Sequence, residues 1–397
     1  MAKKKEEQKN EGVNFEFRSF ERGVVKTPIF SELWNKPGEW LYNGVDNLYP
    51  QELLRLFLDA SSLHTAIIRA KSSMIAGNGF IKEGLSPAAQ NFLKNPFGDE
   101  SLDKVAFKAG MDLSIYGGFY LNVCWSKDGT KIARIEHVPA EKVRIGKPEE
   151  ESVTEYYVSR DWQFYRRGEK NEPKKVPSFN ILDKENPSQI LFAKQYSPGS
   201  EYYQIPSYTA VLNWIKLASE INIFHLKSVQ NNMNLGIIIK NPSGTPPQEM
   251  RDIEYQKIKA RLTGSDTAGD VLLLYAENKD KMPEIEAFPN NGSDQRFRDL
   301  IELCNTNIIL GHGCNDIVAG QSTPGKLSQA AEVEQAYNAF QQKEINPMQK
   351  IVEDCFNRLA TINGIGDELK LEKFKPFDLQ SGMQTADTNT FTVKYIR

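Results

Sequence analysis

The sequence predicts an α+β protein of two or three units, as expected for a chain of 397 residues. Three observations predict this class. Two strand patterns, residues 118–126 and 132–139, flank Asp128-Gly129, a strong signal for a β-hairpin turn. Two short apolar strand patterns, 235–242 and 270–276, enclose a helical pattern. Most of the remaining second half has helical periodicity.

The first half of the chain mixes helices and strands. Helical periodicity runs through residues 48–80 and ends at the helix-stop sequence "GNG". A second helix is expected around Phe107–Ile115, just before the hairpin. The segments 154–162 and 188–197 are strand-like. This part therefore reads as one α+β region with loops outside its core.

A long helical pattern covers residues 208–232. Its apolar residues fall on more than one face, which is typical of a helix that packs on several sides. Both a protein core and a ring of subunits satisfy this pattern, and the sequence does not distinguish them. The apolar positions are Val211, Leu212, Trp214, Ile215, Leu217, Ala218, Ile223 and Leu226.

A strand–helix–strand unit follows. The helix at 246–264 begins with proline and ends at Gly264, as these residues favour. Four apolar side chains fall roughly on one of its faces, so we expect them to cover a small sheet. These residues are Met250, Ile253, Ile258 and Leu262.

Two more helices are expected on either side of a glycine-rich loop. The first is the pattern at 294–313, and the second is the long pattern at 327–361. Pro347 lies inside the second helix, where it removes a hydrogen-bond donor and should kink or split the helix.

The charge balance indicates an ordinary soluble protein. Charged residues make up 25% of the chain, and the formal net charge is -3. Tight, electrostatically driven binding to nucleic acid needs clustered lysine and arginine, so this balance argues against it. Loose contact with nucleic acid stays open.

Cysteine usage and the chain start predict a reduced protein outside membranes. The four cysteines form no C-x-x-C pair, so neither a disulfide framework nor a zinc spacing follows. The opening "MAKKKEEQKNEG" lacks the apolar region of a signal peptide, and we expect residues 1–20 to form a disordered tail. No apolar run approaches the roughly 18 residues of a membrane span.

The stretch from Gly320 to Lys326 reads G-x-x-x-x-G-K, close to a phosphate-binding loop. Such a loop follows a buried strand and has a hydroxyl residue directly after the lysine to hold Mg²⁺. Here Leu327 takes that position, Ser328 comes one residue late, and the preceding segment reads as a helix end. We therefore predict no nucleotide site.

The histidines and cysteines suggest no catalytic or metal site. His312 and Cys314 are i, i+2 neighbours in a loop, which rarely lets a base reach a nucleophile. His64, His137 and His225 have no partner at ligand spacing, so we expect structural or surface roles. We predict no catalytic residue, cofactor or metal, and hence no enzyme.

The order of parts from residue 138 onward resembles the portal proteins of tailed bacteriophages, in the siphophage or lambdoid-type lineage. The stretches that carry the resemblance are "HVPAEKVRIG", "QIPSYTAV", "NNMNLGIIIKNP", "RFRDLIELCNTNIILGHGCNDIVAG" and "SQAAEVEQAYNAFQQKEINPMQKIVEDCFNRL". Two departures concern the subfamily. "CNDIVAG" lacks the proline that commonly follows the loop valine, and in "QILFAKQYS" Ala193-Lys194 stand where the family usually has a histidine.

The resemblance implies a portal-type subunit with an α/β wing, long stem helices, a small α/β clip and a kinked tunnel helix. Beyond the tail it implies the following parts: wing 21–204, first stem helix 205–234, clip 235–288, second stem helix 289–310, tunnel loop 311–326, kinked tunnel helix 327–362, and a C-terminal segment or minimal crown 363–397.

By the same resemblance the protein forms a homo-oligomeric, dodecameric ring at one capsid vertex. The ring is the channel for packaging and ejecting double-stranded DNA, without sequence specificity. Its other partners are the major capsid protein, the terminase large subunit and the head–tail connector. The protein then belongs to the virion, and to the host cytoplasm during assembly.

Two groups of residues follow as candidate sites. A loop of small, uncharged polar residues suits passing DNA because it offers contact without a deep electrostatic well. The channel-facing candidates are Asn315, Gln321, Ser322, Thr323 and Lys326. The candidates for clip contacts with neighbouring subunits and terminase are Ile237, Ile239, Glu249, Arg251, Lys257 and Leu273.

Two alternatives remain open. One is a nucleotide-binding enzyme that uses Gly320 to Lys326, and the other is a different ring-forming structural protein of a virion. Leu327 and the helix expected before the loop argue against the first alternative. The chain length and the clip-like insertion between two long helices argue against the second.

Overall fold

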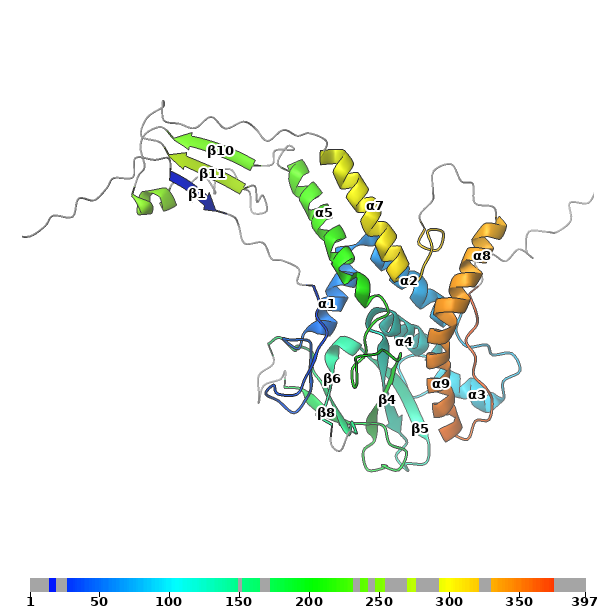
Figure 1. Cartoon of the computed structure of the whole chain (residues 1–397). Coiled ribbons are helices and arrows are strands. Elements are labelled where there is room, and N and C mark those ends of the chain that lie inside the picture. The colour runs from blue at the N-terminus through cyan, green and yellow to red at the C-terminus, as the bar shows by residue number, and fades with distance from the viewer. Residues whose placement is uncertain are drawn as a thin grey trace, which may run out of the picture. The chain divides into compact units, whose positions relative to one another are not determined.

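The computed structural model describes residues 14–18, 27–148, 152–164, 172–230, 236–241, 247–253, 270–275, 293–320 and 330–374. The chain divides into two compact units (Figure 1). Unit 1 consists of residues 1–26 and 216–304, and unit 2 of residues 27–215 and 305–397. The predicted α+β class is confirmed, because helices and sheets are both present in each unit.

The described residues form the following elements. The helices are α1 Tyr49–Arg55, α2 Ser62–Ala76, α3 Pro87–Lys94, α4 Leu102–Tyr116, α5 Leu212–Gln230, α7 Ser293–Gly311, α8 Ala330–Phe340 and α9 Asn346–Ile362, with residues 248–253 also helical. The strands are β1 Asn14–Arg18, β2 Glu32–Leu33, β3 Tyr42–Asn43, β4 Gly118–Trp125, β5 Ile132–Val138, β6 Val143–Ile145, β7 Glu155–Val158, β8 Lys174–Pro177, β9 Ser188–Lys194, β10 Gly236–Asn241 and β11 Asp270–Tyr275.

The centre of unit 2 is an antiparallel sheet of order β5-β4-β9. The hairpin predicted at Asp128-Gly129 joins β4 to β5, and Gly129 takes the positive φ of 65° that such turns favour. Phe119, Leu121 and Val123 of β4 enter the main core. The intervening Tyr120 stacks on Phe192 of β9. Both faces of β4 are therefore covered, which explains its nearly continuous apolar sequence.

Helices α2, α4 and α9 supply the other side of this core (Figure 1). Helical periodicity at 48–80 is realised as α1, a π turn at Leu56–Ala60 and α2. Ser61 separates them with extended backbone, and its hydroxyl accepts the N–H of His64 as an N-cap. This cap fixes the direction in which α2 leaves the turn.

The last described residues close the core. Ile365, Leu369 and Leu371 are buried with Phe356 of α9. The backbone at Leu371 forms an antiparallel bridge to Phe80. The predicted C-terminal segment thus packs on unit 2 as far as residue 374, and residues 375–397 lie outside the described part.

Pro347 does not split the last long helix with a loop. Residues 330–362 are continuously helical, and a π turn at Gln341–Ile345 joins α8 to α9. The N–H of Asn346 donates to the carbonyl of Gln341, five residues earlier. Pro347 then lies in the first turn of α9, where its missing N–H costs least. The predicted irregularity is a π turn immediately before the proline.

Unit 1 contains a second sheet, of order β1-β11-β10. Strands β10 and β11 are parallel, as a strand–helix–strand unit requires, and β1 runs antiparallel to β11. The prediction of a disordered tail at 1–20 is therefore wrong for residues 14–18. Their alternation of Phe15 and Phe17 with polar neighbours is a strand pattern that the charged residues before it obscured.

The helix of unit 1 differs from the prediction in one respect. Met250 and Ile253 were expected to cover the small sheet, but their side chains are 59% and 51% exposed. Ile258 and Leu262 lie outside the described residues. In the same unit, Phe224 of α5 stacks on Phe297 of α7 with ring centroids 4.9 Å apart. None of the helices in the described ranges is long and apolar enough to cross a bilayer.

A fully buried arginine ties the start of unit 2 to its second sheet, β6-β7-β8. The Arg144 guanidinium donates five hydrogen bonds, to Asn47 Oδ1, Asn47 O, Gln51 Oε1, Glu141 O and Val143 O. It also lies 4.8 Å from the ring of Trp162. Burial lowers the pKa of Arg144 to about 10, which still leaves it charged at neutral pH. Uncharged carbonyl and amide oxygens therefore take the place of the water molecules that would hydrate the guanidinium.

We expect Arg144→Met to lower the free energy of unfolding by about 3 kcal/mol, because buried acceptors lose their donors. Urea unfolding followed by tryptophan fluorescence measures this change. Arg69→Met on the exposed face of α2 is the matched control and should change stability by no more than about 0.5 kcal/mol. Equal effects of the two substitutions would contradict the assigned role of Arg144.

Candidate functional site

The loop that follows α7 is the first candidate site. Its described part, residues 312–320, forms a series of turns rather than a strand. The N–H of Cys314 donates to the carbonyl of Ile309, so the loop starts as a continuation of the helix end. Val318 is buried in the main core and anchors the loop to unit 2. The predicted helix-then-turn entry is confirmed, and this is not the strand that a phosphate loop follows.

His312, the first residue after α7, is paired with another buried histidine. Its Nε2 lies 2.9 Å from Nδ1 of His64 on α2. The Tyr208 ring packs on both imidazoles, with centroid distances of 4.9 Å to each. Tyr208 in turn donates its hydroxyl hydrogen to the carbonyl of Ile115. Residues distant in sequence therefore meet at the base of the loop.

A buried ammonium lies beside this pair. The side chain of Lys71, on α2, is 1% exposed, and its Nζ lies 3.7 Å from Oε2 of Glu344 on the π turn. It also lies 5.9 Å from the centroid of the Phe340 ring. Burial lowers the pKa of Lys71, and the Glu344 carboxylate opposes that effect. We call Lys71, His64, His312, Tyr208 and Glu344 the histidine cluster.

The histidines of the cluster are held neutral. Burial, and then the charge of Lys71, lower the pKa of His64 to about 3. The same two causes hold the pKa of His312 well below its usual value. Two neutral imidazoles share one N–H···N hydrogen bond, in which one ring donates and the other accepts.

Cys314 does not have the properties of a nucleophile. Burial raises the pKa of its thiol to about 11, so the reactive thiolate is suppressed at neutral pH. Its Sγ donates to the carbonyl of Asn315, and the neighbouring His312 faces His64 instead. The prediction that His312 and Cys314 do not act together agrees with this geometry.

The channel-facing residues predicted from sequence lie mostly beyond the described part. Gln321, Ser322, Thr323 and Lys326 are outside it. Asn315 is half-buried. Its Oδ1 accepts the N–H of Val318 at 2.9 Å, and its Nδ2 donates to Ala336 O at 3.5 Å. Asn315 therefore shapes the base of the loop.

The predicted clip residues fall in unit 1. Ile237 and Ile239 are in β10 and Leu273 is in β11, where the register pairs Ile239 with Leu273. Glu249 is exposed and Arg251 is half-buried in the helical segment 248–253. Lys257 lies outside the described residues.

Sequence reasoning missed the histidine cluster. His64 and His312 are 248 positions apart, and neither has a partner at a recognisable spacing. His137 was missed for the same reason: its Nε2 lies 2.8 Å from Oδ2 of the buried Asp112. The one local feature that could have pointed to the cluster is the position of His312, which comes directly after the end of α7 and directly before Gly313.

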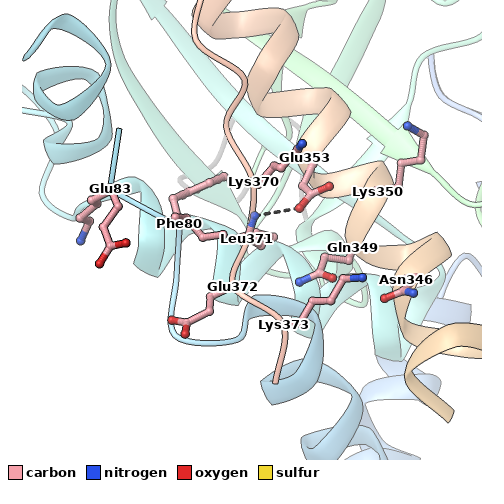
Figure 2. Close-up of a pocket in the computed structure, with 12 residues that line it drawn as sticks. Phe80, Glu83, Asn346, Gln349, Lys350, Glu353, Lys370, Leu371, Glu372 and Lys373 are labelled. Atoms are coloured by element: carbon pink, nitrogen blue, oxygen red, sulfur yellow. Dashed lines mark hydrogen bonds between the residues drawn. The ribbon is translucent and has the colours of Figure 1, made fainter. Parts of the chain in front are cut away.

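A groove of about 900 Å³ opens beside α9 in unit 2 (Figure 2). Phe80 and Leu371 lie at its centre, and lysines alternate with glutamates around them. Glu353 accepts the N–H of Leu371, and Lys370 pairs with Glu368, so these charges are used within the chain. The groove has no glycine-rich turn at a helix start, and we assign no nucleotide to it. Within the described ranges no three metal-ligating side chains come together.

Comparisons with known proteins show which proteins this chain is similar to. No protein-family model matches the chain. A chain of "Virion of native gene transfer agent (GTA) particle" shares the fold, with a TM-score of 0.55 and 12% identity over 85% of this chain and 86% of that one. A chain of "Neck of native GTA particle computed with C12 symmetry" gives a TM-score of 0.53 and 12% identity over 82% and 83%.

A sequence match is more specific. The "Probable portal protein" of Escherichia phage P2 is 22% identical over 273 residues, which are 68% of this chain and 70% of that protein. The predicted resemblance to the portal proteins of tailed phages is thereby confirmed. The particular lineage within them stays a prediction.

Gly313 gives a direct test of the histidine cluster. It has a positive φ of 65°, and a Cβ there would overlap the carboxylate of Glu344. Gly313→Ala should therefore displace Glu344 from Lys71 and lower the free energy of unfolding by about 3 kcal/mol, measured by urea unfolding.

Gly320→Ala is the matched control for that substitution. Gly320 also has a positive φ, of 74°, but a Cβ at this position would meet no atom of the described residues within 4 Å. Gly320→Ala should therefore lower the free energy of unfolding by only about 1 kcal/mol, the cost of the positive φ for a residue with a Cβ. Equal losses at Gly313 and Gly320 would show that contact with Glu344 contributes nothing.

Proposed function

We propose that this chain is the subunit of a portal, a ring at one capsid vertex through which double-stranded DNA enters and leaves. The observation that carries the proposal is the curated portal relative, which matches over 68% of the chain. The fold shared with the GTA neck chain supports a place in a virion. That neck was computed with C12 symmetry, which favours a dodecameric ring for this protein as well.

The sheet of unit 1 supplies a means of closing such a ring. In its order β1-β11-β10, strands β1 and β10 are the two edges, and no other described strand pairs with either. An edge strand carries unpaired N–H and C=O groups that a second chain can satisfy. We infer that the β10 edge of one subunit pairs with the β1 edge of its neighbour.

The direction of the strands is consistent with ring symmetry. Subunits in a cyclic ring are related by rotation about its axis, so equivalent strands keep one sense around the ring. Within one sheet, β1 is antiparallel to β11 and β10 is parallel to β11. Pairing β10 with the next β1 would therefore be antiparallel, the more stable arrangement.

The helical segment 248–253 adds a contact surface to the proposed clip. Met250 and Ile253 are more than half exposed, and Glu249 beside them is also exposed. Apolar side chains rimmed by charge are typical of protein-binding surfaces. We propose that this surface binds the terminase large subunit during packaging and the head–tail connector afterwards. The major capsid protein would contact unit 2.

The loop after α7 is the proposed channel lining. Its base is held to unit 2 by His312 and Val318, so the following residues have a fixed origin. Gln321, Ser322 and Thr323 are short polar residues that contact a duplex without strong electrostatic retention, and Lys326 can reach a phosphate. Asn315 positions the loop in this proposal and does not itself contact DNA.

We expect the purified full-length protein to form rings with a central hole wide enough for a duplex. Deleting residues 1–18 removes β1, so rings should be lost at concentrations where the full chain assembles. Negative-stain electron microscopy and mass photometry measure the fraction of rings.

Deletion of residues 1–10 is the control, because it leaves β1 intact and should leave ring formation unchanged. Full-length protein that stays monomeric or dimeric at assembly concentrations would contradict the portal proposal. Rings that persist after deletion of residues 1–18 would contradict only the pairing of edges.

The enzyme alternative has its own test. The proposal expects no Mg²⁺-dependent ATP binding, and so no change on Lys326→Ala in isothermal titration calorimetry. ATP binding that Lys326→Ala abolishes would establish the alternative site at Gly320 to Lys326.

A further inference from the structure

We propose that the histidine cluster is a proton-sensitive latch that holds the base of the loop, residues 312–320, against α2 and releases it as the pH falls. The latch is a property of unit 2 alone, and it does not depend on ring formation. Its parts are the hydrogen bond between His64 and His312 and the neighbouring ion pair of Lys71 with Glu344.

The geometry and burial of the two imidazoles favour a neutral pair. Their facing nitrogens are 2.9 Å apart and share one hydrogen. The outer nitrogens, Nε2 of His64 and Nδ1 of His312, are buried without a hydrogen-bond partner among the described residues. In the neutral pair one outer nitrogen already carries a hydrogen. A proton added to the other would find no acceptor, and a second added proton would remove the shared bond.

The surroundings make an added proton costly. Lys71 already brings one positive charge to the cluster, and its side chain is as buried as the histidines. Apart from Lys71, the titratable groups around the two histidines come from α1, the segment before α5, the loop and the π turn. They are Tyr49, Tyr208, Cys314, Asp316, Lys343 and Glu344.

None of these groups compensates a charged histidine. Burial raises the pKa of Tyr49 to about 12 and that of Cys314 to about 11, so both stay neutral. Glu344 is the nearest carboxylate, and its Oε2 is paired with Lys71. A histidine that takes up a proton must therefore leave the cluster for water.

Movement of His312 out of the cluster moves the loop. His312 directly follows α7, and the N–H groups of Gly313 and Cys314 are bonded back to that helix end. The N–H groups of Val318 and Ala319 are bonded to Asn315 within the same turn. These amides should thus exchange with solvent together when the latch opens.

The pH dependence follows from the difference in proton binding. In the closed state the pKa of His64 lies near 3 and that of His312 is also low. In the open state each histidine has the ordinary pKa of about 6.5 and binds a proton below it. Opening therefore becomes more favourable as pH falls below 6.5, by about tenfold between pH 7.5 and 5.5 for each histidine.

Hydrogen–deuterium exchange of the full-length protein tests this, with rates at each pH divided by the intrinsic chemical rate. For residues 313–319 the opening equilibrium should rise about a hundredfold from pH 7.5 to 5.5, a range above the ordinary pKa of carboxyl groups. His64→Gln or His312→Gln should reduce the rise to about tenfold, because glutamine keeps a hydrogen bond but takes up no proton. The double variant should be nearly independent of pH.

His225→Gln on α5 is the matched control and should keep the hundredfold rise. If the histidine variants do not fold, Lys71→Met is the second variant. Removal of the buried cation lets the closed state accept a proton more easily, so the rise should become smaller. An opening equilibrium in the wild-type protein that is constant from pH 7.5 to 5.5 would overturn the proposal, as would a double variant that retains the full rise.

Discussion

The arrangement of unit 2 around the end of α7 depends on one buried cation. The ammonium of Lys71 is taken out of water by α2, and an unpaired charge in that position would cost several kcal/mol. Glu344 is the carboxylate that faces it, and Glu344 can do so because the π turn directs it toward α2. Gly313 lacks a Cβ, which leaves room for that carboxylate. The loop, the π turn and α2 are thus constrained together.

Arg144 shows a second way to bury a cation in the same unit. Its guanidinium has five donors in a rigid plane, and main-chain and amide oxygens satisfy all of them without a carboxylate. Lys71 has a compact ammonium and lies near a single carboxylate. The many hydrogen bonds of Arg144 therefore suit a rigid structural role, whereas the single ion pair of Lys71 suits a site that can open.

Unit 1 is organised on a different principle. Its sheet has only three described strands. A sheet of this size is marginal by itself and gains stability from further partners. Strand β1 contributes one such partner from the start of the chain. The open edges and the exposed Met250 and Ile253 are consistent with further contacts between chains.

Local patterns in the sequence determined the order of elements, the hairpin at Asp128-Gly129, the strand–helix–strand unit and the irregularity at Pro347. They also carried the resemblance to portal proteins, which rests on order and turn residues. These features depend on residues that are close in the chain, so periodicity and turn chemistry report them directly. Only the tertiary structure decided that residues 14–18 join a sheet, that Lys71 and Arg144 are buried, and that His64 meets His312. A charged or polar residue is recognised as buried only when its partner is known, and these partners come from distant segments.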